Sequence, residues 1–201
     1  MAILMDHLIS WMIAVPIIGI VILGFMRDEE SIRRVAFGIT IVEFFLSLIL
    51  WRSFDLTLQN MQFVERMEWM PTFNIQYAVG VDGISILLVI LTALLCPLCI
   101  LCSWTGITTR VRAYFSLILL VESAMIVVFT ALDLFLFFML WELTMIPMYF
   151  MIILWGGPNR IAAGLKFLLY SLTGSLLLLV GILGIYINGG HTYDLLVLTE
   201  Q

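Results

Sequence analysis

Four ionisable residues stand inside long apolar stretches of this sequence: Glu43, Glu122, Glu142 and Lys166. The clearest case is Glu142 in "FFMLWELTMIPMYF", residues 137–150, where most neighbours are aromatic or aliphatic. A charged side chain at the centre of a bilayer costs about 2.5 to 3.5 kcal/mol on insertion scales, and such residues commonly line proton or ion pathways. Carboxyl groups buried at low dielectric can exchange protons near neutral pH. The pattern therefore predicts proton-relay chemistry inside a membrane.

Glu122 and Glu142 have matching positions around a turn. The stretch 111–155 is too long for one crossing, and "TALDL" is its only plausible turn, with Asp133 at the membrane interface. Each Glu is ten residues from the centre of that turn, which places both about 15 Å in from the same interface. An antiparallel helical hairpin can bring them into one layer. We expect a polar track there, with one carboxyl protonated or a cation between the two.

Pro147 follows Glu142 by five residues. Its ring would clash near the carbonyl of Leu143, which also loses its helical hydrogen-bond partner. Backbone freed at membrane depth needs water, a hydroxyl group or a neighbouring helix, and Thr144 and Tyr149 are the nearby candidates. A kink beside a buried acid suits a hydrated path, although Pro147 taken alone favours a purely structural kink.

Structural roles compete with proton chemistry at each charged position. A Glu can hydrogen-bond to Ser or Thr across helices for packing alone, as Glu122 with its neighbour Ser123 illustrates. For Glu43 neither role is favoured. The stem of Lys166 can extend toward the lipid headgroups, or the ammonium can turn inward as a relay for an acid. Both alternatives for Lys166 stay open.

The composition is that of a membrane protein. Of 201 residues, 63% are hydrophobic and 11% are charged, and the mean hydropathy is +1.16, outside the usual range of water-soluble domains. The net charge of −5 leaves no basic surface for nucleic acid. The first residues, "MAILMDHLIS", lack the basic start of a signal peptide, so we expect a retained first span.

Six stretches are long enough to cross the bilayer as helices. They lie near residues 5–26, 34–52, 83–104, 112–131, 134–155 and 162–187. The fold class is therefore all-α and polytopic. The one long loop, residues 53–82, alternates loosely and contains Pro71, which favours a hairpin on the outer face over a solvated linker. "GVDGIS" then starts the third span, with Asp82 as its N-cap.

Arginines in the loops predict the orientation, because cytoplasmic loops carry the excess of basic residues. Loops one, three and five hold six of them, whereas loops two and four hold only Arg52 and Arg66. We therefore expect the odd loops in the cytoplasm and both chain ends on the other side. "WGGPNR" ends the fifth span, and "AGLKFLLYSLTGS" presents small and hydroxyl residues for close helix approach. The small and hydroxyl residues of this predicted face are Tyr170, Ser171, Thr173, Gly174 and Ser175.

The cysteines and the absent motifs limit the chemistry. Cys96, Cys99 and Cys102 in "CPLCILC" lack a fourth ligand and lie in an apolar span, where free cysteines usually act as small hydrophobic residues. No metal site is expected. The sequence also has no phosphate-binding glycine loop, zinc-protease motif or nucleophile elbow, so it does not support chemistry on a soluble substrate.

Three segments together resemble one family. "ALDLFLFFMLWELTMIPMYFMIILWGG", with "AVGVDGIS" upstream and "AAGLKFLLYSLTGS" downstream, is similar to the proton-pumping, antiporter-like membrane subunits of respiratory NADH:quinone oxidoreductase (complex I). Within these it resembles chain M, called chain 4 in mitochondria. The resemblance covers residues from about 77 to 187, and W-E-x-x-x-I-P-M-Y is rather specific to that subunit. Residues 1–76 match only in their pattern of spans.

The resemblance implies specific roles. Glu142 corresponds to an essential membrane acid in the proton path, and Glu122 to a Glu whose role in the path is less certain. Lys166 matches a family Lys for which the resemblance implies no firm function. It also implies that NADH, flavin, iron-sulfur clusters and quinone bind partner subunits and none binds this chain. The expected partners are other membrane subunits and the lipid bilayer, most simply in a bacterial inner membrane.

Family members continue through further spans built as two inverted repeats, and the lysine partner of the fifth-span Glu lies on a broken seventh helix. We therefore expect residues 1–201 to form one membrane domain from the N-terminal portion of such a subunit. Residues 1–111 would be leading helices and residues 112–187 the start of the first repeat. The rival predictions are a subunit of a multi-subunit cation/proton antiporter, a hydrogenase-linked relative and a structural scaffold.

Overall fold

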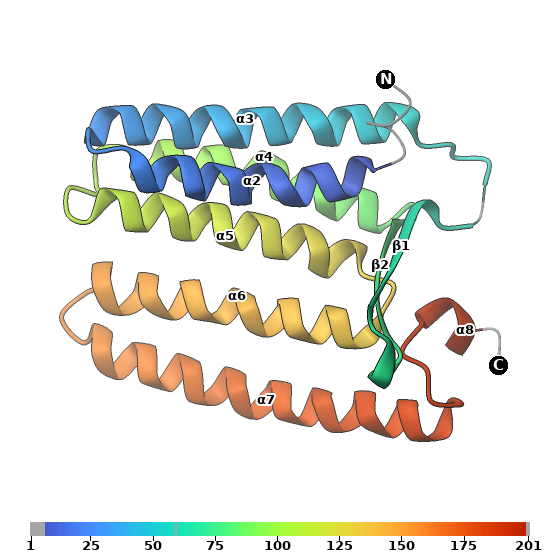
Figure 1. The fold of residues 1–201 in the computed structure, drawn as a ribbon. Helices are drawn as coiled ribbons and strands as arrows, with labels where there is room; N and C mark the ends of the chain where they lie inside the picture. The colour runs from blue at the N-terminus through green and yellow to red at the C-terminus, as the bar shows by residue number, and fades with distance from the viewer. Residues whose placement is uncertain (1–6, 59, 200–201) are drawn as a thin grey trace.

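The computed structural model describes residues 7–58 and 60–199. It has six long helices that run side by side (Figure 1): α2 (Leu8–Phe25), α3 (Glu29–Ser53), α4 (Ser85–Ser103), α5 (Val111–Thr130), α6 (Leu134–Trp155) and α7 (Arg160–Asn188). All six are long and apolar enough to cross a membrane, which confirms the predicted number. Residues 5 and 6, where the first span was expected to begin, lie outside the described residues.

Helix α3 begins five residues before the predicted residue 34. The Asp28 carboxylate accepts a hydrogen bond of 2.8 Å from the Ser31 backbone N–H, and Glu29 and Glu30 complete an acidic first turn. Acidic groups stabilise a helix N-terminus because they satisfy free N–H groups and oppose the helix dipole. Hydropathy located the apolar part of this helix, whereas the cap determines where the helix starts.

Helix α5 is the centre of the bundle. It packs against α2, α3, α4 and α6, whereas α7 lies along α6 at the edge. Phe115, Leu119 and Ile126 of α5 are fully buried. In contrast, Leu177 and Val180 of α7 are 71% and 66% exposed. Residues on α5 are therefore enclosed by protein, and residues on the outer faces of α6 and α7 face lipid or further protein.

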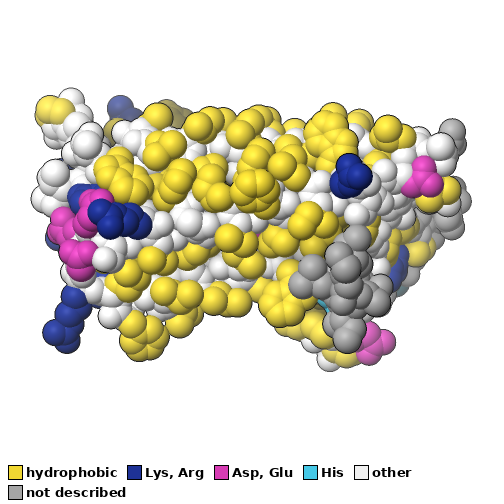
Figure 2. Space-filling view, turned by 90° about the horizontal axis from the view of Figure 1, so that it is seen from above, with side chains coloured by type: hydrophobic (Ala, Val, Ile, Leu, Met, Phe, Trp, Pro, Cys, Tyr) yellow, Lys and Arg dark blue, Asp and Glu magenta, His cyan; other side chains and the backbone are white. Residues whose placement is uncertain are grey.

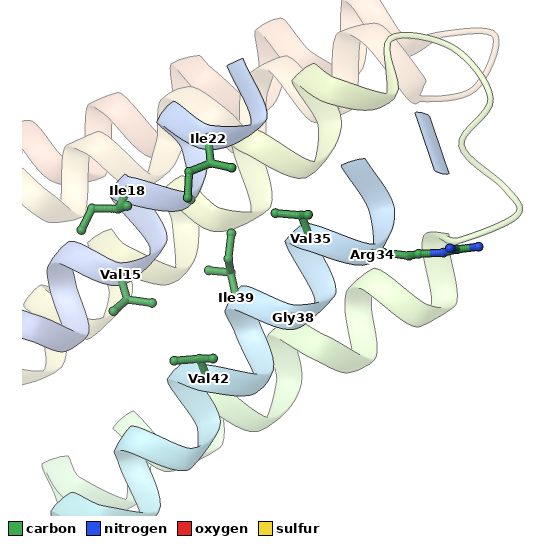
Figure 3. Close-up of a pocket in the computed structure, with 9 residues that line it drawn as sticks. Val15, Ile18, Ile22, Arg34, Val35, Gly38, Ile39 and Val42 are labelled. Carbon is green, nitrogen blue, oxygen red and sulfur yellow. The ribbon is translucent and has the colours of Figure 1, made fainter. Parts of the chain in front are cut away.

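Hydrophobic side chains cover the middle of the face shown in Figure 2, and charged side chains gather toward its two ends. A groove of about 550 Å³ opens on the outside of the bundle between α2 and α3. Its lining residues are Val15, Ile18, Gly19, Ile22, Arg34, Val35, Gly38, Ile39 and Val42 (Figure 3). Arg34 is the only ionisable residue in this lining, so the groove has the chemistry of an apolar contact surface and not of a proton path.

The loop at residues 53–82 contains the predicted hairpin. Strands β1 (Gln62–Met70) and β2 (Ile75–Val81) pair antiparallel, and a short 3-10 turn, η1 (Pro71–Phe73), joins them. Ala131 forms a bridge with Val79 of β2, and the Leu195 N–H donates to the Leu132 carbonyl at 2.8 Å. The hairpin, the α5–α6 turn and the start of α8 (Leu195–Thr199) are thus joined at one end of the bundle (Figure 1).

Asp133 occupies the predicted turn. As the N-cap of α6, its side chain accepts hydrogen bonds of 2.9 Å from both the Phe135 and the Leu136 N–H. It also accepts a 3.1 Å bond from the Gln76 N–H of β2. Burial raises the pKa of this carboxyl, against the lowering effect of those bonds. Asp133 therefore starts α6 and ties it to the hairpin.

The Asp82 carboxylate bonds the turn that leads into α4, although the N-cap of the helix is Ile84 and not the predicted Asp82. Its carboxylate accepts hydrogen bonds from the Ser85 N–H at 2.7 Å and the Ile84 N–H at 3.1 Å. The bond from Ser85 is the main reason that the pKa of Asp82 lies below its ordinary value. Helix α4 begins at Ser85, later than the predicted residue 83, because a turn at residues 82–84 precedes the regular helix.

Candidate functional site

Two carboxyl groups lie together in the centre of the bundle. Glu43 of α3 and Glu122 of α5 both have 0% exposure, and the two helices pack against each other. All four carboxyl oxygens are buried and have no hydrogen-bond partner among the described residues. The Cys96 thiol of α4 faces both carboxyls. Three helices thus enclose a polar site that the sequence did not predict as a unit.

Nearby hydroxyl groups are bonded elsewhere. Thr40 and Ser47, which flank Glu43 on α3, donate to the carbonyls of Phe37 and Phe44 in their own helix. Ser123 donates to the Ile13 carbonyl of α2 at 2.9 Å. The packing bond between α5 and α2 is therefore made by Ser123, and Glu122 takes no part in it.

Glu142 is half-buried in the middle of α6. Its Oε1 atom is buried without a hydrogen-bond partner in the described part of the chain. Phe135 and Tyr149 lie seven residues to either side of Glu142, and residues seven apart share a helix face. Phe135 packs against Tyr193, which follows α7, and the Tyr149 ring lies beside Gly164 of α7. Glu142 is therefore on the face of α6 that turns toward α7.

Glu122 and Glu142 are each eight residues from the end of their helix at the α5–α6 turn, so they occupy matching positions along the hairpin. Their partners differ, however. Glu122 lies with Glu43 and Cys96, whereas Glu142 lies on the α7 side of α6. The interactions of the described residues do not join the two acids. Equal depth therefore did not determine which side chains meet.

Lys166 is exposed near the start of α7. Within the described residues it forms no ion pair, so the structure does not bring it to Glu142. Both alternatives from the sequence stay open for it.

Pro147 is buried within α6, which continues from Leu134 to Trp155. The Thr144 hydroxyl donates to the Trp141 carbonyl at 2.7 Å. Thr144, one of the two candidate partners for the Leu143 carbonyl, therefore bonds the preceding turn of its own helix instead. Tyr149, the other candidate, packs toward α7.

Close approach of α6 and α7 occurs at Gly164. A Cβ atom there would lie 2.4 Å from Cγ2 of Ile153, which only glycine avoids. The predicted small-residue face is positioned differently, because Gly174 has open space around it and Tyr170 is 78% exposed. Ser175 of that face is buried and Ser171 is half-buried, so the prediction holds in part, and the closest approach of "AGLKFLLYSLTGS" to α6 is at its first glycine.

Glu65 is a structural residue that the sequence analysis missed. It belongs to β1, is nearly buried and accepts hydrogen bonds from the Ile9 and Ser10 N–H groups of α2 at 3.0 and 3.2 Å. It also bonds the Ser10 hydroxyl. The α2 N-cap, His7, supplies no side-chain cap, so a residue 56 positions away caps this helix. No local pattern could indicate that role.

The described residues contain no group of three or more His, Cys, Asp or Glu placed to hold a metal ion. Cys96, Cys99 and Cys102 all lie on α4 with free thiols.

The six spans and the buried acids define a multi-pass α-helical membrane protein. Residues 11–130 match the family model described as NADH-ubiquinone oxidoreductase chain 4, amino terminus. Residues 131–200 match that described as NADH:quinone oxidoreductase/Mrp antiporter, TM. The chain belongs to the NADH-ubiquinone oxidoreductase chain 4 family, as the resemblance predicted.

Similar proteins occur in a plant and in bacteria, and one of the similar chains belongs to a solved structure. NADH-ubiquinone oxidoreductase chain 4 of Arabidopsis thaliana is 39% identical over 96% of this chain and 40% of its own length. NADH-quinone oxidoreductase subunit M of Rhodobacter capsulatus is 40% identical over 94% of this chain and 37% of its own. A chain of respiratory complex I from Thermus thermophilus has a TM-score of 0.81 and 27% identity, covering 94% of this chain and 38% of its own. The chain thus spans about two fifths of the length of these relatives.

Proposed function

We propose that this chain is part of a membrane subunit of a proton-translocating NADH:quinone oxidoreductase, and that it couples electron transfer to proton movement. The observation that carries the proposal is Glu142, a half-buried acid in an apolar helix with an unpartnered carboxyl oxygen. A membrane-embedded acid of this kind suits a proton relay. Family membership and the similarity to a complex I subunit support this assignment over a soluble or purely structural role.

In this proposal Glu142 alternately takes up and releases a proton. The side chain faces α7, so a positive charge that approaches from that side would favour its ionised form, and withdrawal of that charge would favour protonation. Such an exchange couples a movement of charge to a movement of protons. We propose Glu122 as a second residue of the path. Lys166, which is exposed near the start of α7, is a proposed relay residue.

Redox chemistry is assigned to other subunits. The resemblance implies that NADH, flavin, iron-sulfur clusters and quinone bind those subunits, and that this chain supplies none of their ligands. The apolar outer faces of α6 and α7 suit contact with further helices of the same subunit, with neighbouring membrane subunits or with lipid. Residues 112–187 are proposed to begin the first antiporter-like repeat, after leading helices in residues 1–111.

Purification of the full-length protein from its native membrane tests the assignment. We expect it to co-purify with subunits that oxidise NADH and reduce quinone, and with that activity. Co-purification with cation/proton antiporter subunits, together with sodium/proton exchange and no quinone reduction, would support the alternative function. That alternative is kept because one matching family model also describes Mrp antiporters. A hydrogenase-linked complex would instead show hydrogen-dependent activity.

We further propose that the protein lies in a bacterial inner membrane, with the hairpin end outside the cytoplasm. Glu68 on β1 and Asn159 between α6 and α7 are exposed at opposite ends of the bundle. In spheroplasts, a membrane-impermeant maleimide should label a Glu68→Cys variant directly and an Asn159→Cys variant only after permeabilisation. The unmodified protein controls for its native cysteines. The reverse labelling order would show that the orientation is inverted.

A further inference from the structure

The carboxyl pair of Glu43 and Glu122 has no positive charge to balance it from the helices that enclose it. Helices α2 and α4 contain no Lys or Arg. On α3 the basic residues closest in sequence, Arg34 and Arg52, are each nine positions from Glu43, about 13 Å along a helix. On α5, Arg112 is ten positions from Glu122.

The nearby hydroxyl groups do not compensate for the missing positive charge by donating hydrogen bonds to the two carboxyls. The hydroxyls of Thr40, Ser47 and Ser123 are bonded to backbone carbonyls. Helix α2, which packs against both α3 and α5, has no ionisable residue. Across the described residues, the titratable group that faces the pair from α4 is the Cys96 thiol, which is a weak donor.

A buried carboxylate without a counter-charge or donors is strongly disfavoured, and such groups usually become neutral. Two ionised carboxylates at close range are disfavoured further by their mutual repulsion. We infer that Glu43 and Glu122 form a proton-holding site between α3, α4 and α5, in which at least one carboxyl carries an exchangeable proton at neutral pH.

The site differs from Glu142 in position and in composition. It lies where α3, α4 and α5 meet, whereas Glu142 faces α7 from α6. Helices α6 and α7 lie on the opposite side of α5 from α3 (Figure 1). As a proton store that includes Glu122 of the proposed path, the pair rests on the proposed function. The inference that the pair holds a proton depends only on burial and missing partners. The proton-holding site and the proposed function can therefore be disproved independently.

Infrared spectroscopy of the full-length protein in membranes tests the inference. The unmodified protein should show a carbonyl band from protonated carboxyl groups at neutral pH, and this band should shift in deuterated water. Glu43→Gln and Glu122→Gln should each change the band, and the double substitution should remove the part due to the pair. In each single variant the band that remains should come from the other carboxyl of the pair.

Glu29→Gln is the matched control. Glu29 is an exposed carboxylate on α3, the helix that contains Glu43, and its side chain is 56% exposed. Its loss should therefore leave the protonated band unchanged. Glu142→Gln should also leave the pair's contribution in place, whatever it does to transport. If a Gln variant does not accumulate, Glu43→Asp and Glu122→Asp keep the carboxyl and should displace the band.

Three outcomes would overturn the inference: a band unaffected by every substitution in the pair, two carboxylates ionised at neutral pH, or a band controlled by sodium or potassium concentration. The last would identify a cation site.

Discussion

Replacing Glu142 with Gln in the full-length protein is expected to abolish proton pumping while the protein still assembles in the membrane. Gln has nearly the same size and can hydrogen-bond, but it cannot release a proton. Because the Glu142 side chain is half-buried on the α7 face of α6, this substitution of nearly equal size removes the titratable group without creating a cavity. The expected loss is therefore in transport and not in folding.

The measurement is NADH-driven acidification in membrane vesicles, with the amount of assembled complex measured in parallel. Glu68→Gln is the matched control, because Glu68 is an exposed carboxylate on β1, outside the membrane spans. It should pump at the normal rate. Glu142→Asp keeps the carboxyl and should retain part of the activity. Normal pumping by an assembled Glu142→Gln protein would disprove the role of Glu142 and support the scaffold alternative.

Replacing Glu65 with Ala is expected to destabilise the protein by about 3 kcal/mol. Three donors of α2, the N–H groups of Ile9 and Ser10 and the Ser10 hydroxyl, lose their shared acceptor. A hydrogen bond to a charged group contributes about 1.5 to 3 kcal/mol, and a buried donor left unpaired adds a penalty. A lost helix cap alone typically costs about 1 kcal/mol. The three bonds share one carboxylate, so their contributions do not simply add.

Thermal unfolding in lipid or mild detergent measures this effect. Glu65→Gln retains one acceptor oxygen and should unfold at an intermediate temperature. Glu68→Ala changes an exposed Glu of the same strand and should stay within about 0.5 kcal/mol of the unmodified protein. If Glu65→Ala and Glu68→Ala unfold together, the hairpin does not stabilise α2 through Glu65.

Local patterns in the sequence determined most of the secondary structure. The six spans follow from apolar length, and the hairpin in residues 53–82 from alternation and Pro71. Asp82 and Asp133 start helices by bonds to N–H groups two or three residues ahead. The equal depth of Glu122 and Glu142 follows from counting residues on either side of one turn. All of these depend on neighbours in the chain, so the sequence alone contains them.

The tertiary structure decided which side chains meet. Glu43 joins Glu122 because α3 and α5 pack face to face, and the thiol of Cys96 reaches them from α4. A cysteine that looked like a small apolar residue in sequence thus lies at a polar site. Glu142 turns toward α7, and Glu65 caps a helix 56 positions away. Depth in a membrane follows from position along one helix, but contact requires the rotation and packing of several helices, which only the folded chain determines.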